Sequence, residues 1–484
     1  MSFVSLEFLV FITALIGIYY ALIPPKWRWC ALLAASMVFY LLADRAAFIY
    51  FLSMIVASYL LSRSIYNLKL KGAASSVQKG MLAAAILVTI MPTLVTKDLE
   101  YIWTSILNHE SHHWIMATGM SFFMLQMIAY YVDIWRGKIE PEKNFFKYAL
   151  FISFFPQIIQ GPIPRYEQLH TSLMKEHRWD ARGLVRGAQL VLWGFFLKLM
   201  IADKAGIVVD SVFSNYRTYM GGYVLVAGIL SGFQVYTDFV SCVSIAKGVS
   251  EMLGVELADN FNHPFFSISI KDFWRRWHMS LGSWLRDYIY FPLGGSRKGK
   301  VRKHINILIT FLVSGIWHGA GIKYAAWGIM HGIYQVAGDM SADLQSKIYR
   351  ILGFEKDSRL EMWGRRAGVF IWLIPNWIIF RADSVKQAAY MMLSVFTVRN
   401  PWIFYDDSLF TLGLEWKEWV VLALSIYVLM KVSIMQEKCV VRDRVLEQPL
   451  VVRWTLYIAA IVIIWVFGTY GFGFNAKDFI YAAF

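Results

Sequence analysis

Two histidines of this chain lie in surroundings where an imidazole can do chemistry. His318 sits between small residues in the string SGIWHGA at residues 314–320, inside an otherwise apolar run. Near pH 7 a neutral imidazole is suited to take a proton from a hydroxyl that attacks a thioester, and a dry site disfavours its charged form. A lone core histidine is more often a satisfied hydrogen-bonding residue, so this string alone leaves both interpretations open.

His278 lies in a stretch that mixes charge with aromatic rings, KDFWRRWHMSL at residues 271–281, followed by Trp284, Arg286 and Asp287. If the stretch is one helix, Trp274 and His278 share a face, as do Asp272 and either Arg275 or Arg276. Ionisable groups in a membrane protein are costly and normally face a bundle interior, where they mark function. The same pattern also fits an interfacial helix whose arginines meet lipid phosphates.

His331 lies one helical turn after Trp327 in the string WGIMHG at residues 327–332. We expect it to pack or to form a supporting hydrogen bond. His278, His318 and His331 have no short ligand spacing and no evident carboxylate partner, so no metal site is predicted.

The elements that must position these residues are expected to be helices in lipid. The 484 residues are 58% hydrophobic with a mean hydropathy of +0.48, and apolar runs long enough to cross a bilayer recur along the chain. We predict an all-α polytopic protein with about 11–13 transmembrane helices plus re-entrant and amphipathic helices. Residues 1–484 are expected to form a single membrane domain, with the catalytic stretch at about 261–331.

The net charge of +14 fits membrane topology better than nucleic-acid binding, because the basic residues cluster in short loops between apolar runs. We expect the cytoplasmic loops at residues 63–79, 136–147, 165–186, 297–303 and 438–453. The run 145–164 contains Pro156, Pro162 and Pro164 and is expected to break or to re-enter the membrane, because proline removes backbone hydrogen bonds.

Strings spread over almost the whole chain resemble the membrane-bound O-acyltransferase superfamily, and within it the bacterial branch of alginate and peptidoglycan O-acetylation proteins. They are SFF (121–123), YVDIWR (131–136), FPQIIQGPI (155–163), YTDF (236–239), NFNHPF (260–265), FWRRWHMSL (273–281), WLRDYIYFPLGG (284–295), GIWHGA (315–320), FRADS (380–384) and DFIY (478–481). The resemblance implies a central tunnel that acyl donor enters from the cytoplasm and acceptor from outside. It maps the essential histidine to His318 and the second polar position to His278.

From the resemblance we expect an acetyltransferase of the bacterial cytoplasmic membrane that acetylates an extracytoplasmic polysaccharide: an alginate-like exopolysaccharide, cellulose or peptidoglycan. The donor is cytoplasmic acetyl-CoA, no cofactor is bound tightly, and the partner is an extracytoplasmic acetyltransferase resembling SGNH hydrolases. The donor's phosphates are expected near Arg275, Arg276 or Arg286, since arginine forks match phosphate oxygens, or near the basic loop 297–303. Trp274, Trp277, Trp317 and His331 complete the predicted substrate-contacting set.

The C-terminal string FIYAAF at residues 479–484 resembles an aromatic ending of this branch and makes Tyr481 a candidate acyl acceptor. Three alternatives stay open, one of which is a structural scaffold for a polymer synthase. The D-alanylation proteins of teichoic acid share the Trp-His element, which permits D-alanyl transfer. A transporter or channel with proton-relaying histidines would also suit broken helices.

Overall fold

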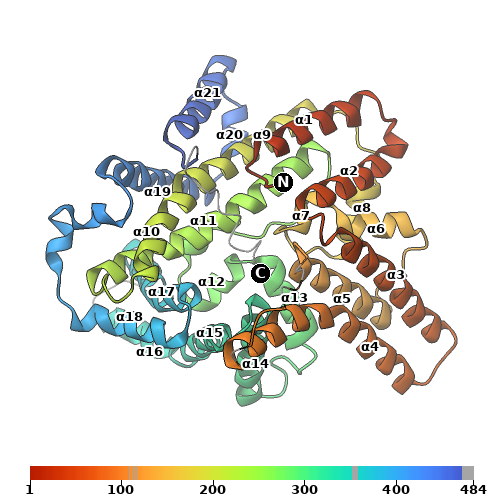
Figure 1. Ribbon diagram of the computed structural model, residues 1–484, viewed down its shortest axis with the longest axis horizontal. Helices are drawn as coiled ribbons and strands as arrows, with labels where there is room; N and C mark the ends of the chain where they lie inside the picture. The colour runs from red at the N-terminus through yellow and green to blue at the C-terminus, as the bar shows by residue number, and fades with distance from the viewer. Residues whose placement is uncertain (108, 113, 115–116, 352–357, 471–484) are drawn as a thin grey trace. The chain divides into compact units, whose positions relative to one another are not determined.

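The computed structural model describes residues 1–470 except 108, 113, 115–116 and 352–357. Throughout this described part the regular elements are helices, which confirms the all-α prediction (Figure 1). The chain forms two compact units. Unit 1 comprises residues 1–193 and 242–258, and unit 2 comprises residues 194–241 and the described residues from Asp259 onward. The expectation of a single membrane domain stays a prediction.

Unit 1 contains α3, α4 and α5, which pack against one another. Its helices are α1 (Leu6–Ala21), α2 (Arg28–Ala43), α3 (Phe48–Leu70), α4 (Ser75–Thr93), α5 (Met120–Arg136), α6 (Phe145–Ser153), α7 (Phe155–Ile158), α8 (Tyr166–Met174) and most of α9 (Ala181–Phe196). The predicted break in the run 145–164 is confirmed, because Phe154 separates α6 from the short α7 and no helix follows until Tyr166.

Unit 2 carries every predicted site residue that the structure describes. Its helices are α10 (Asp203–Ser214), the first two-thirds of α11 (Gly222–Met252), α12 (Ile270–Arg276), α13 (Met279–Leu285), α14 (Lys300–His318), α15 (Ile322–Met340), α16 (Ala342–Ile351), α17 (Arg359–Arg381), α18 (Val385–Thr397), α19 (Trp416–Gln436), α20 (Val441–Leu446) and α21 (Leu450–Phe467). A π-helical segment, Leu197–Ala202, joins α9 to α10.

Six helical stretches in the described residues are long and apolar enough to cross a membrane: Phe48–Leu70, Ser75–Ile106, Ala181–Ser214, Gly222–Met252, Trp416–Gln436 and Leu450–Phe467. They make the chain a multi-pass membrane protein. The number is smaller than the eleven to thirteen expected from the sequence. Several apolar runs form helices that fall short of a full span, such as α1 and α2, each of 16 residues, and α5, of 17 residues.

α14 and α15 form an antiparallel hairpin whose backbones touch. A Cβ on Gly315 would lie 2.3 Å from the backbone oxygen of Tyr324, and a Cβ on Gly328 would lie 2.3 Å from that of Phe311. Any larger residue at either position would push the helices apart. At the open end of the hairpin Lys303 pairs with Asp339. This close packing holds the last turn of α14 against the first turns of α15.

Candidate active site

His318 is the last residue of α14 and is almost completely buried. Aromatic rings enclose its imidazole: the ring centroids of Trp317 and Trp327 both lie 4.8 Å away, and that of Phe380 lies 5.8 Å away. These rings come from α14, α15 and α17, so three helices converge on one side chain. An enclosure of this kind excludes water and favours the neutral imidazole that general-base chemistry requires.

His278 lies between two short helices and not on one continuous helix. α12 ends at Arg276, Trp277 is extended, and His278 takes a left-handed conformation with φ of 42° before α13 begins. The predicted shared helical face of Trp274 and His278 is therefore wrong. A left-handed backbone is strained for a residue with a side chain and persists where its surroundings fix it.

The backbone of residues 260–262 supplies that fixation. The amide of Asn262 donates to the carbonyl of Arg276 at 2.9 Å, and the amide of Met279 donates to the carbonyl of Asn260 at 2.9 Å. These two bonds hold the turn from both sides. They turn the His278 side chain away from the α12 helix face and into the protein, where it is 1% exposed.

The side chain of Asn260 also determines which nitrogen of His278 carries the proton. Its Oδ1 accepts the backbone amide of Ser280 at 3.1 Å and the Ser280 hydroxyl at 2.8 Å, and it lies 3.2 Å from His278 Nδ1. An atom that accepts a backbone N–H must be the amide oxygen, so His278 Nδ1 is the donor. In the neutral imidazole the lone pair then lies on Nε2.

Trp317 joins the two histidines. Its ring lies 4.8 Å from that of His318 and 5.9 Å from that of His278. Phe239 of α11 packs against the His278 ring at 4.8 Å. The structure thus brings His278, His318 and Trp317 into one aromatic enclosure. Their catalytic roles stay predictions.

His331 and Trp274 form a second group beside the first. Their rings lie 4.8 Å apart, edge to face, and each contacts Trp327, at 4.8 Å for His331 and 6.0 Å for Trp274. Trp277 points elsewhere and packs on Phe273 at 5.3 Å. Trp327, which the sequence analysis used only as a neighbour of His331, touches both groups and connects them.

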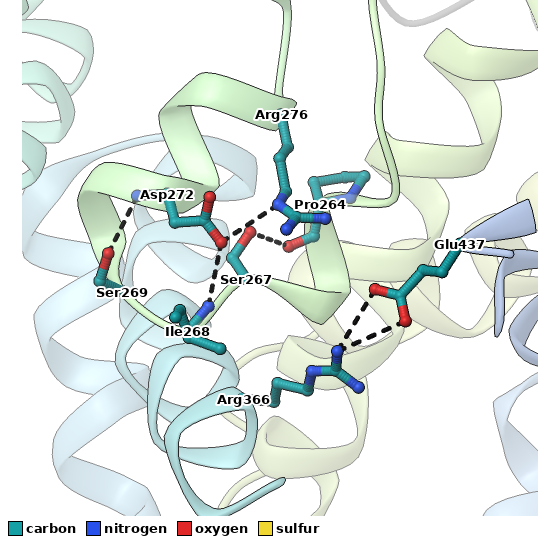
Figure 2. A network of polar contacts seen from close by, with 8 residues as sticks. All are labelled: Pro264, Ser267, Ile268, Ser269, Asp272, Arg276, Arg366 and Glu437. Atoms are coloured by element: carbon teal, nitrogen blue, oxygen red, sulfur yellow. Dashed lines mark hydrogen bonds and ion pairs between the residues drawn. The ribbon is translucent and has the colours of Figure 1, made fainter. Parts of the chain in front are cut away.

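The three predicted phosphate-binding arginines lie in different surroundings. Arg276 pairs with Asp272 at 3.1 Å, four residues earlier on α12, as the helical spacing predicted (Figure 2). Asp272 also accepts the backbone amide of Ile268, so this carboxylate holds the start of the element. Arg275 and Arg286 are exposed, the latter 3.8 Å from Asp287. A phosphate-binding role for any of them stays a prediction.

A buried ionic cluster is a feature that sequence reasoning missed. Lys198 Nζ lies 2.7 Å from Asp238 and 3.0 Å from Asp203; Lys198 and Asp238 are almost fully buried, and the Asp203 side chain is 8% exposed. Lys198 belongs to the π-helical segment, and Asp238 immediately precedes Phe239, which covers His278. The cluster therefore anchors the part of α11 that lines the site. The sequence did contain a signal for this cluster, because Lys198 and Asp238 are each a charged residue inside an apolar run.

Two further expectations concern the limits of the site. Tyr481, the candidate acyl acceptor, lies outside the described residues. In residues 1–470, with the gaps named above, no group of three histidine, cysteine, aspartate or glutamate side chains is placed to hold a metal ion.

Comparison with known proteins also identifies this region as that of an acyltransferase family. The family model described as MBOAT, membrane-bound O-acyltransferase family, matches residues 141–380, which include both histidines. The chain is 32% identical over 405 residues to the probable alginate O-acetylase of Pseudomonas fluorescens, covering 82% of this chain and 76% of that protein.

Two other relatives align over shorter regions. The chain is 32% identical over 262 residues to the peptidoglycan O-acetyltransferase of Helicobacter pylori, covering 49% of this chain and 49% of that protein. It is 28% identical over 262 residues to the teichoic acid D-alanyltransferase of Bacillus subtilis, covering 51% of this chain and 65% of that protein.

The multi-pass helical fold, the matched family model and the long alignment with an O-acetylase agree with one another. They identify an O-acyltransferase and replace the transporter or channel interpretation. The chain belongs to the membrane-bound O-acyltransferase family, in the branch of alginate and peptidoglycan O-acetylation proteins.

Proposed function

We propose that this protein takes an acetyl group from cytoplasmic acetyl-CoA and passes it across the bacterial cytoplasmic membrane for O-acetylation of an extracytoplasmic polysaccharide. The observation that carries the proposal is the pair of buried histidines joined by Trp317, with His318 at the end of α14. The alginate and peptidoglycan acetylating relatives favour acetyl as the acyl group.

In this mechanism His318 is the general base. The acceptor hydroxyl attacks the thioester carbonyl, its proton moves to His318, and collapse of the tetrahedral intermediate breaks the carbon–sulfur bond. The CoA thiolate leaves and takes the proton back from His318, so the histidine is restored and the products are the acetyl ester and free CoA.

His278 has a supporting role in the same step. Because Asn260 holds the proton on Nδ1, neutral His278 offers a lone pair at Nε2. Such a nitrogen accepts a hydrogen bond from a donor group of the acceptor other than the attacking hydroxyl, whose single proton goes to His318, and it has no proton for a developing oxyanion. This tautomer therefore supports a role in orienting the acceptor and not in stabilising the oxyanion.

The final acceptor lies outside the membrane. The alginate and peptidoglycan acetylating relatives support a polysaccharide as the final acceptor. The transfer is completed by an extracytoplasmic partner resembling SGNH hydrolases. The immediate acceptor is Tyr481, a partner serine or the sugar itself. Donor entry from the cytoplasm is what the family resemblance implies, and the basic loops are the ones that the positive-inside rule assigns to that side.

The test is transfer of radiolabelled acetyl from acetyl-CoA by the purified full-length protein in nanodiscs, with His318→Ala and Tyr481→Phe in parallel. We expect CoA release or labelled product from the parent and none from His318→Ala. Loss of label with Tyr481→Phe identifies the tail as acceptor. Absence of thioester consumption by the folded parent, with partner and polymer present, contradicts the proposal.

D-alanyl transfer is the second candidate, and the 28% identical teichoic acid relative is the observation that favours it. A carrier-bound D-alanyl thioester offered to the same preparation separates the two. Consumption of that thioester but not of acetyl-CoA would replace acetyl by D-alanyl as the transferred group and leave the site assignment intact.

A further inference from the structure

Four polar side chains near Trp327 have buried donor or acceptor atoms with no hydrogen-bond partner among the described residues. They are Trp274 (Nε1), Ser314 (Oγ), His331 (Nδ1) and Asn376 (both Nδ2 and Oδ1), and we name them the inner polar cluster. Asn376 is 0% exposed. A buried polar group without a partner is destabilising and rare in a native protein, so each needs an explanation.

Ring contacts place two members of the cluster beside Trp327, and helical spacing places a third near His318. Trp274 and His331 contact each other and both contact Trp327. Ser314 lies one helical turn before His318, whose ring also contacts Trp327. The cluster is therefore adjacent to the candidate general base.

Asn376 is placed by the packing of α17 on α15. Phe380 contacts Trp327 at 5.5 Å, and Trp372 contacts Tyr334 at 5.3 Å, so the two helices run antiparallel. Asn376 lies four residues from both Trp372 and Phe380 and shares their helix face. It therefore faces α15 between Trp327 and Tyr334, which is the level of His331.

The cluster also has a defined position along the route to His318. At the N-terminal half of α17, Arg366 pairs with Glu437 at 3.3 Å, next to the basic loop 438–453 that we expect in the cytoplasm (Figure 2). Asn376 lies ten residues further, about 15 Å along the helix, and Phe380 about 6 Å beyond it. Phe380 contacts His318 at 5.8 Å.

The hairpin α14–α15 has the same orientation. Its open end, where Lys303 pairs with Asp339, follows the basic loop 297–303, and His318 lies at the opposite end of α14. From the expected cytoplasmic side the order is thus basic residues, then the inner polar cluster, then His318.

We propose that the inner polar cluster binds the amide groups of the pantetheine arm of the acyl donor. The cluster is uncharged when its histidine is neutral and contains both donors and acceptors. It therefore suits a neutral amide, with Asn376 supplying one donor and one acceptor to it, and does not suit phosphate. A CoA thioester has the same order of groups, phosphates, amides and then the thioester. This inference rests on the proposed use of a CoA thioester.

The experiment compares thioesters with and without amides. We measure kcat/KM for acetyl-CoA, for acetyl-pantetheine, which keeps the amides but has no phosphates, and for S-acetyl-2-mercaptoethanol, which has neither. Asn376→Leu should lower kcat/KM about 10-fold for the two amide-bearing donors, the loss of two neutral hydrogen bonds. For the amide-free donor its kcat/KM should stay within about twofold of the parent's.

Asn306→Leu is the matched control, because Asn306 is equally buried but donates to the backbone carbonyl of Gly295 at 2.8 Å. It should lower the Tm and reduce activity on all three donors alike, whereas Asn376→Leu should not lower the Tm. Equal losses for Asn376→Leu on all three donors would overturn the amide assignment alone. A folded parent that consumes no acetyl-CoA would overturn the proposed function and this inference with it.

Discussion

Unit 2 contains two groups of buried polar side chains that differ in how they are satisfied. In the ionic cluster, Lys198 is paired with both Asp203 and Asp238 at 3.0 Å or less. In the inner polar cluster, the neutral groups of Asn376, His331 and Trp274 have no hydrogen-bond partner among the described residues. Both lie beside the histidine pair, one through Phe239 and the other through Trp327.

The difference distinguishes support from recognition. Charges are too costly to leave unpaired in an apolar environment, so the ionic cluster is paired within the protein and holds α11 in place. Neutral groups cost less when unpaired, so a membrane enzyme can keep them ready for a substrate. The following predictions test this division, in order of decreasing effect.

The largest effect is expected at His318, which the inner polar cluster adjoins through Trp327. His318→Ala should lower acetyl transfer by about 10²–10⁴-fold, because general-base assistance is lost. His304→Ala, at the other end of α14, is the matched control and should stay within about twofold of the parent. CoA release by nanodisc preparations of equal folded content is the measurement. Substantial activity in His318→Ala would contradict the assignment of His318 as the general base.

Lys198→Met should act on stability. It leaves two buried carboxylates without their cation, and breaking a buried pair in this way costs about 3–5 kcal/mol of the free energy of unfolding. Adding Asp203→Asn and Asp238→Asn should recover much of that loss, because no buried charge then remains in the cluster. Thermal unfolding in detergent measures both variants. An unchanged Tm for Lys198→Met would mean that the cluster does not support α11.

Substitutions of Asn260 test whether its side chain supports catalysis by fixing the tautomer of His278. Asn260→Ala should lower kcat about 10-fold with little change in KM for acetyl-CoA. The reason is that Asn260 no longer holds the proton of His278 on Nδ1, while the donor still binds. Asn260→Asp keeps an oxygen that accepts from His278 and Ser280 and should retain more activity than Asn260→Ala. If both variants lose activity equally, the oxygen of Asn260 is not what matters.

Much of the fold could be predicted from the sequence, because bilayer-length apolar runs and prolines act locally. The helical class and the break in residues 145–164 are examples. That Asp272 would lie beside Arg275 or Arg276 was also predictable, since it depends only on helical spacing, and the structure selects Arg276. These features need no knowledge of what packs where.

The site depends on long-range packing and was harder to predict. The left-handed turn at His278 is fixed by backbone bonds to residues 260–262, which no local pattern of residues 271–281 reveals. The link from Lys198 to Asp238 joins residues forty positions apart. The interest of Asn376 appears only once its amide is seen to be buried without a partner.

The smallest effects are expected at the exposed arginines. They are predicted to recognise the charged phosphates of the donor, whereas the inner polar cluster is proposed to recognise its neutral amides. Arg275→Gln and Arg286→Gln should each raise KM for acetyl-CoA about two- to fivefold, because exposed charges contribute little and are screened. Added salt should shrink both effects, and acetyl-pantetheine, which has no phosphates, should show neither. Salt-insensitive losses on both donors would move these arginines from phosphate binding to structural support. In that case the basic loop 297–303 is the remaining predicted site for the donor's phosphates.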